Sequence, residues 1–159
     1  MRHTIAVLVE NKFGVLARIS GLFSARGYNI ASLAVSETLD PEISYMTIVV
    51  EAKDEKILEQ IKKQLNKLVD VVTVTDFTNK EHLERELALV KIKYSPKEKP
   101  ALDALLNKYI AKVIQHKGDT AIIEVVDEQS KIKQLLDSLA GFGIKALVRP
   151  GKIAIRIDQ

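Results

Sequence analysis

The clearest chemistry in this chain belongs to residues 10–16, which read ENKFGVL. Gly14 precedes an apolar stripe with helical spacing, so a helix beginning there would present free backbone N–H groups to a carboxylate or phosphate. The side-chain oxygen of Asn11 can accept a hydrogen bond from an ammonium group. Carboxylate and ammonium together indicate an amino acid. An equally good interpretation is that Asn11 shapes the turn and Gly14 packs closely. Asn29, in the turn RGYNI, is likewise either a turn residue or a ligand contact.

The other residues that could do chemistry do not form a catalytic or metal site. The chain has no cysteine, so disulfides, thiolate ligands and a cysteine nucleophile are excluded. Its three histidines have no metal-ligand spacing, which favours structural or solvent-exposed roles. Gly141 to Ala146 match G-x-G-x-x-A, but they follow a predicted helix and enter a strand, the reverse of a dinucleotide fingerprint. We therefore expect no enzyme activity in this chain.

The charge pattern gives little support for nucleic-acid binding. The net charge is +3: residues 1–79 carry nine Lys and Arg against ten Asp and Glu, and residues 80–159 carry fifteen against eleven. Only eight of 159 residues are aromatic, and the predicted strand 120–126 has none on which bases could stack. We interpret the basic excess as a solvated surface of the second half, which includes Lys91, Lys93, Lys97, Lys99, Lys131 and Lys133.

The predicted strands and helices that position these residues occur in the same order in both halves of the chain. In the first half the pattern predicts strands at 4–9, 30–35, 45–50 and 71–77, a helix at 15–23, and a second helix at 58–68 with Asp54 as its N-cap. In the second half it predicts strands at 87–94, 110–116 and 120–126. One helix there starts at the capping box SPKE, and a second is capped by Asp127. Segments 146–148 and 153–157 are expected to finish the second sheet.

This order predicts an α+β fold of two tandem ferredoxin-like βαββαβ domains. The expected ranges are 1–78 for the first domain, 79–84 for a linker and 85–159 for the second domain. Each domain is small and one-sided, so we expect association within or between chains. No apolar run approaches the roughly 20 residues of a membrane span, and no hydrophobic signal core follows Met1, so we expect a cytoplasmic protein without membrane contact.

A family resemblance is carried by VLVEN at 7–11, GVLAR at 14–18, GLF at 21–23, RGYNI at 26–30 and MTI at 46–48. It continues through LEQI at 58–61, KLVDV at 67–71 and RELALVK at 85–91, and returns at Gly143, Arg149, Gly151, Ala154 and Arg156. The chain resembles the small regulatory subunit of acetolactate synthase (acetohydroxyacid synthase), with its ACT domain in the first half. It departs from the usual family pattern at Ala31, Tyr45 and Pro150.

The resemblance implies a non-catalytic subunit that activates the catalytic large subunit in valine, isoleucine and leucine biosynthesis. It would confer feedback inhibition by a branched-chain amino acid, with valine the usual effector in the family. Thiamine diphosphate, Mg²⁺ and FAD would belong to the large subunit, and this chain would hold no cofactor or metal. The alternative is a free-standing ACT-type amino-acid sensor that controls a different partner.

The resemblance also implies an allosteric homodimer formed through the ACT domain, with the effector at the interface. Asn11, Gly14, Val15 and Leu16 match contacts from one chain, and Asn29 and Ile30 match contacts from the other. The role of the second domain stays open.

Overall fold

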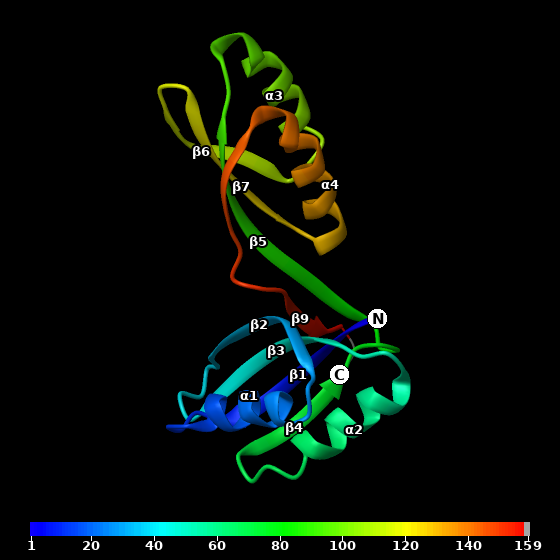
Figure 1. The fold of residues 1–159 in the computed structure, drawn as a ribbon. Coiled ribbons are helices and arrows are strands. Elements are labelled where there is room, and N and C mark those ends of the chain that lie inside the picture. The colour runs from blue at the N-terminus through cyan, green and yellow to red at the C-terminus, as the bar shows by residue number, and fades with distance from the viewer. Residues whose placement is uncertain (158–159) are drawn as a thin grey trace. The chain divides into compact units, whose positions relative to one another are not determined.

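The computed structural model describes residues 1–157, which form two compact units. Unit 1 comprises residues 1–83 and 152–157, and unit 2 comprises residues 84–151. Each unit has one antiparallel sheet and two α-helices in the order βαββαβ (Figure 1). The predicted pair of ferredoxin-like folds is therefore confirmed.

Unit 1 places its strands in the order β2-β3-β1-β4. Its elements are β1 (Arg2–Glu10), α1 (Val15–Ala25), β2 (Asn29–Glu37), β3 (Ile43–Glu51), α2 (Glu55–Leu65) and β4 (Val71–Asp76). Asp54 caps α2 as predicted, because its Oδ1 accepts a hydrogen bond from the Ile57 backbone N–H at 2.9 Å. Gly27 follows α1 with φ +66°, the left-handed conformation expected at a helix end.

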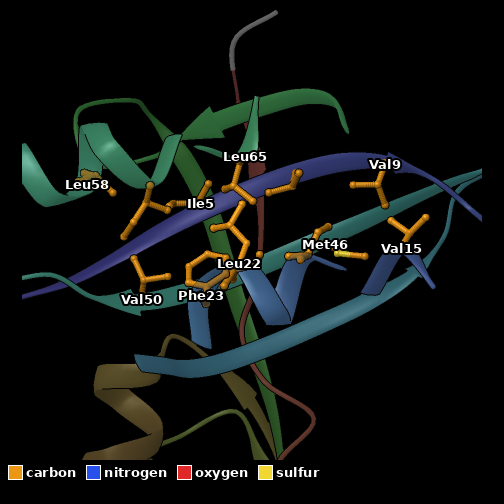
Figure 2. Close-up of a cluster of buried hydrophobic side chains, with 13 residues drawn as sticks. Ile5, Val9, Val15, Leu22, Phe23, Met46, Val50, Leu58 and Leu65 are labelled. Carbon is orange, nitrogen blue, oxygen red and sulfur yellow. The ribbon is translucent and has the colours of Figure 1, made fainter. Parts of the chain in front are cut away.

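The helices of unit 1 cover one face of its sheet. Alternate residues of the two central strands, among them Ile5, Val9, Met46 and Val50, meet Phe23 of α1 and its neighbours in one buried cluster (Figure 2). The alternation follows from the two-residue period of a strand, which sends every second side chain to the same face. Val15, the first residue of α1, is anchored in this cluster, so the core fixes where the helix begins.

The opposite face of the same sheet is covered by β9 (Ile153–Arg156). Ala154 of β9 is buried against Ala6 and Phe77. The Tyr45 hydroxyl donates to the Ala154 carbonyl at 2.7 Å, and the Ala154 N–H donates to the Thr47 hydroxyl at 3.4 Å. Burial raises the pKa of Tyr45 above its ordinary value. Tyr45 thus fastens β9 to the sheet.

Unit 2 repeats the strand order of unit 1 as β6-β7-β5-β8. Its elements are β5 (His82–Lys93), α3 (Lys99–Leu106), β6 (Ala111–Lys117), β7 (Thr120–Asp127), α4 (Gln129–Leu139) and β8 (Ile144–Val148). Strand β5 begins in unit 1, and a 3₁₀ turn (Pro96–Glu98) leads into α3. Arg149 closes the unit by donating from Nε to the buried carboxylate of Glu86 at 3.0 Å.

Three details differ from the sequence-based expectations. Strand β9 pairs with β5, as expected for a strand of the second sheet, but by its contacts it groups with unit 1; β5 begins at His82, inside the expected linker. The N-cap of α4 is Glu128, not Asp127; the Asp127 carboxylate instead accepts from the Glu128 N–H at 2.8 Å and pairs with Lys131 at 3.4 Å. The helix-stop interpretation of Gly143 is confirmed, since it has φ +69° and precedes β8.

A pH dependence follows from Asp76, at the end of β4. Burial raises its pKa, but hydrogen bonds from the Thr78 N–H and hydroxyl and from Lys62 outweigh that effect, so the pKa lies below its ordinary value. The unfolded chain therefore binds this proton more readily, and stability is lost as the pH falls. We expect the unfolding free energy of the wild type to drop between about pH 5 and pH 3.

Denaturant titrations across that range test this expectation. The Asp76→Asn variant should show a shallower drop than the wild type, whereas Glu81→Gln, a change at an exposed carboxylate of the same unit, should reproduce the wild-type slope. Equal slopes for all three proteins would contradict the assignment.

Candidate functional site

The predicted helix start lies at the junction of β1 and α1. Gly14 is the N-cap of α1 with φ +82°, and no side chain caps the helix there. The Val15 N–H reaches the Lys12 carbonyl at 3.3 Å, and the N–H groups of Leu16 and Ala17 have no acceptor among residues 1–157. Free N–H groups at the positive end of a helix dipole suit an anion such as a carboxylate.

Asn11 has a structural role and keeps one polar atom available. Its backbone N–H donates to the Glu42 carbonyl at 2.6 Å, and its Nδ2 donates to the Pro41 carbonyl at 2.8 Å. Because Nδ2 faces a carbonyl, the amide orientation is fixed. Its Oδ1 accepts no hydrogen bond from the residues that the structure describes. Asn11 therefore shapes the turn, as one interpretation predicted, and its contact with a ligand stays a prediction.

A cavity of about 360 Å³ opens at this junction. Its inner wall is apolar and includes Val9, Val15 and Met46, which lie at one end of the core cluster (Figure 2). Leu16 and Val35, each about two-fifths exposed, continue this wall outward. The remaining lining is polar and comprises Glu10, Asn11, Lys12, Ser36, Glu37 and Ser44. An apolar wall with a polar rim fits a small ligand with one aliphatic and one charged end.

Two ion pairs fix the surroundings of the helix start. Lys12 Nζ lies 2.7 Å from Glu10 Oε2, and this hydrogen bond raises the pKa of Lys12. Arg18 donates from Nε to Asp70 Oδ2 at 2.7 Å. A Cβ atom at Gly14 would lie 3.1 Å from Nη1 of Arg18, so the glycine leaves room for this guanidinium. Arg18 thereby ties α1 to the loop before β4.

Asn29 and Ile30 lie at the other end of β2. Asn29 pairs in register with Glu51, whereas Glu37, in the cavity wall, pairs with Ser44. The six residue-to-residue steps from Asn29 to Val35 span about 20 Å of strand. Asn29 Nδ2 donates to Glu51 Oε2 at 3.1 Å; this bond, followed by the Arg2 ion pair, lowers the pKa of Glu51. One chain therefore groups Asn11, Gly14, Val15 and Leu16 but not Asn29 and Ile30.

Sequence reasoning missed the cavity wall contributed by β2 and β3. Val35, Ser36, Glu37, Ser44 and Met46 reach the cavity because β3 pairs with both β1 and β2: Val7 and Val35 lie opposite Met46, and Val9 and Glu37 lie opposite Ser44. The alternation of apolar and polar residues in these strands was visible. Their register, which brings them to one corner, was not.

The histidines and carboxylates of residues 1–157 do not come together in a metal site. Within residues 1–157 no group of three or more His, Cys, Asp or Glu side chains could hold a metal ion. His3 is buried, and its Nδ1–H donates to the Thr78 hydroxyl oxygen at 3.1 Å, because the hydroxyl hydrogen is directed at Asp76. The ring of His82 packs on Phe77. No helix in the described part of the chain has the length and apolar character needed to cross a membrane.

Both halves of the chain match family models, and both models describe the small subunit of the same enzyme. Residues 5–73 match the model described as the AHAS small subunit-like ACT domain. Residues 85–157 match the model described as the small subunit of acetolactate synthase.

Individual relatives extend this similarity over nearly the whole chain. The probable acetolactate synthase small subunit of Archaeoglobus fulgidus is 45% identical over 155 residues, covering 98% of this chain and 96% of that protein. The Bacillus subtilis small subunit is 39% identical over 154 residues, covering 97% and 90%. The crystal structure of the Thermotoga maritima small subunit superimposes with a TM-score of 0.89 at 34% identity, covering 100% and 99%.

Proposed function

This chain belongs to the family of acetolactate synthase small subunits, and we propose that it is the non-catalytic regulatory subunit of that enzyme. The observation that carries the proposal is the similarity over both domains and nearly the full length, at 45% identity to a relative of almost equal size. Its partner is the catalytic large subunit, to which we assign the thiamine diphosphate, Mg²⁺ and FAD. The chain raises the activity of that partner in valine, isoleucine and leucine biosynthesis.

The effector in this proposal is a branched-chain amino acid, with valine the first candidate. Its carboxylate binds the free N–H groups at the start of α1, and its ammonium group donates a hydrogen bond to Asn11 Oδ1. Its aliphatic side chain fits the wall formed by Val15 and Leu16. Asn29 and Ile30 complete the site from the second chain of a homodimer formed through the ACT domain, which accounts for their distance from the cavity within one chain.

The mechanism in this proposal is thermodynamic linkage between effector binding and activation of the large subunit. The large subunit is activated by one arrangement of the regulatory dimer, and the effector binds the other arrangement more tightly. A ligand shifts such an equilibrium only by its difference in affinity for the two states. A coupling of about 1–3 kcal/mol is typical of such systems and corresponds to a roughly fivefold to 150-fold change in affinity.

Acetolactate formation by the cognate large subunit tests the proposal. We expect its rate to rise when this chain is added and to fall again when valine is titrated, with leucine and isoleucine as comparisons. A rate unaffected by the chain, together with failure to recover the large subunit from a pull-down, would reject the regulatory-subunit role. The alternative of a free-standing sensor would then stand if the isolated chain still bound an amino acid.

The two-chain site gives a separate prediction at Asn29. We expect Asn29→Ala to weaken valine binding about tenfold, because one hydrogen bond to a charged group is lost. Mixed dimers with wild-type chains should regain binding at the interface pocket that stays intact. Asn79→Ala, at an exposed asparagine elsewhere in unit 1, is the matched control in calorimetry. Unchanged affinity in Asn29→Ala would place the second half of the site elsewhere.

A further inference from the structure

Unit 2 contains a cavity of about 320 Å³ at the corner that corresponds to the cavity of unit 1. It lies where β5 leads into α3, beside the end of β6, just as the first lies where β1 leads into α1, beside the end of β2. Its lining is formed by Tyr94, Pro96, Lys99, Leu102, Asp103, Val113, His116 and Gly118.

Backbone hydrogen bonds place the two corners in register. The last residue of β1, Glu10, pairs with Ile43, and the next residue, Asn11, donates its N–H to the Glu42 carbonyl. In unit 2, Lys93 pairs with Thr120, and Tyr94 donates its N–H to the Asp119 carbonyl at 2.8 Å. Tyr94 therefore occupies the position in its unit that Asn11 occupies in the first.

The cavity of unit 2 has an apolar wall and charges of both signs. Leu102 is 1% exposed and Tyr94 is 6% exposed, and the Tyr94 ring packs edge-on against the ring of His116 at 5.6 Å. Lys99 and Asp103 are one helical turn apart on the face of α3 that also carries Leu102.

These charged groups are not used inside the protein. Lys99 and Asp103 form no ion pair with each other, and neither side chain has a hydrogen-bond partner in the part of the chain that the structure describes. Elsewhere in unit 2 the charges pair readily, as Lys93 does with Asp119 at 3.1 Å and Lys112 with Glu124 at 3.0 Å. An unpaired cation and anion that flank an apolar wall are complementary to a molecule with the same three features.

We propose that unit 2 carries a second small-molecule site, which binds an aliphatic amino acid. Lys99 binds the carboxylate, Asp103 binds the ammonium group, and the aliphatic side chain packs on Leu102 and Val113. The Tyr94 hydroxyl and the His116 ring close the site on the β5 and β6 sides. The site stands on the cavity of unit 2 alone and holds whether or not unit 1 binds an effector.

Residue-resolved NMR titration of the full chain tests the site directly. With L-leucine as the probe, we expect saturable shifts of the backbone amides of Lys99, His116 and Gly118. Two analogues dissect the recognition: 4-methylpentanoate lacks the ammonium group, and 3-methylbutylamine lacks the carboxylate. Each should bind about fivefold more weakly than L-leucine, as expected for the loss of one exposed ion pair. Titrations with L-valine and L-isoleucine define the preferred side chain.

Variants separate the site from a general surface effect. Lys99→Gln and Asp103→Asn should each weaken binding about fivefold. Lys97→Gln removes a neighbouring exposed charge outside the cavity lining and should stay within about twofold. The proposal is overturned if none of the three amino acids gives a saturable shift in residues 84–151, or if Lys99→Gln and Lys97→Gln behave alike. Shifts confined to residues 10–16 also overturn it, and they leave the site of unit 1 unaffected.

Discussion

The Gly14→Asp variant is expected to bind valine at least a hundredfold more weakly than the wild-type chain while it still activates the large subunit. The new carboxylate would stand at the helix start, where the effector's own carboxylate has to bind the free N–H groups. Two like charges in contact at a partly desolvated site cost several kcal/mol, and about 2.7 kcal/mol corresponds to a hundredfold loss. Feedback inhibition should disappear at valine concentrations that inhibit the wild type.

Backbone strain has to be separated from this charge effect. Gly14 has φ +82°, and any side chain there must also fit beside Arg18. Aspartate and asparagine tolerate the left-handed region similarly, so Gly14→Asn carries the same strain without the charge. We expect both variants to lose about 1 kcal/mol of stability, and only the aspartate variant to lose binding a hundredfold. Equal valine affinities by calorimetry would show that the pocket does not lie at this helix start.

The second large effect is expected in β9. Ala154→Asp places a carboxylate between Ala6 and Phe77, where Ala154 is 4% exposed. An unpaired buried charge is so unfavourable that β9 should detach from the face of the unit 1 sheet rather than accommodate it. The expected loss is about 3 kcal/mol of stability in unit 1. Amide hydrogen exchange should accelerate at Ala154 and Ile157, whose N–H groups bond to Thr47 and Glu81.

The neighbouring residue provides the matched control. Ile155 is on the same strand and is 62% exposed, so Ile155→Asp adds the same charge on the solvent side. We expect it to stay within about 1 kcal/mol of the wild type. If both substitutions destabilise unit 1 equally, β9 does not cover the sheet as the structure shows.

Much of the fold could be predicted from sequence because its elements carry local signals. Apolar residues at helical spacing located α1 and α2, and Asp54 marked the start of α2. Segment 153–157 was predicted as a strand of the second sheet, and β9 does pair with β5, but its packing on the sheet of unit 1 was not predicted. This packing depends on distant residues such as the Tyr45 hydroxyl and the Thr47 hydroxyl. No residue close to Ala154 in the sequence indicates those contacts.

The candidate site, like the fold, could be predicted from the sequence only in part. Asn11 and Gly14 were identified because a helix start is a local feature; in the structure Asn11 lines the cavity and Gly14 is the N-cap of α1. The wall from Val35 to Glu37 depends on strand register, which the sequence pattern leaves open. The assignment of Asn29 and Ile30 to the same effector site remains a prediction, because it requires the second chain of a dimer.

The return of β9 to unit 1 has a consequence for the protein during its synthesis. A domain emerging from the ribosome ordinarily folds as soon as its own residues are available. Here the sheet of unit 1 is translated first, but the strand that covers its second face is translated only after all of unit 2. Until then Ala6 and Phe77 have no cover from β9. Completion of unit 1 therefore has to wait until unit 2 has been translated, and a nascent chain stalled within unit 2 would expose this apolar surface to chaperones.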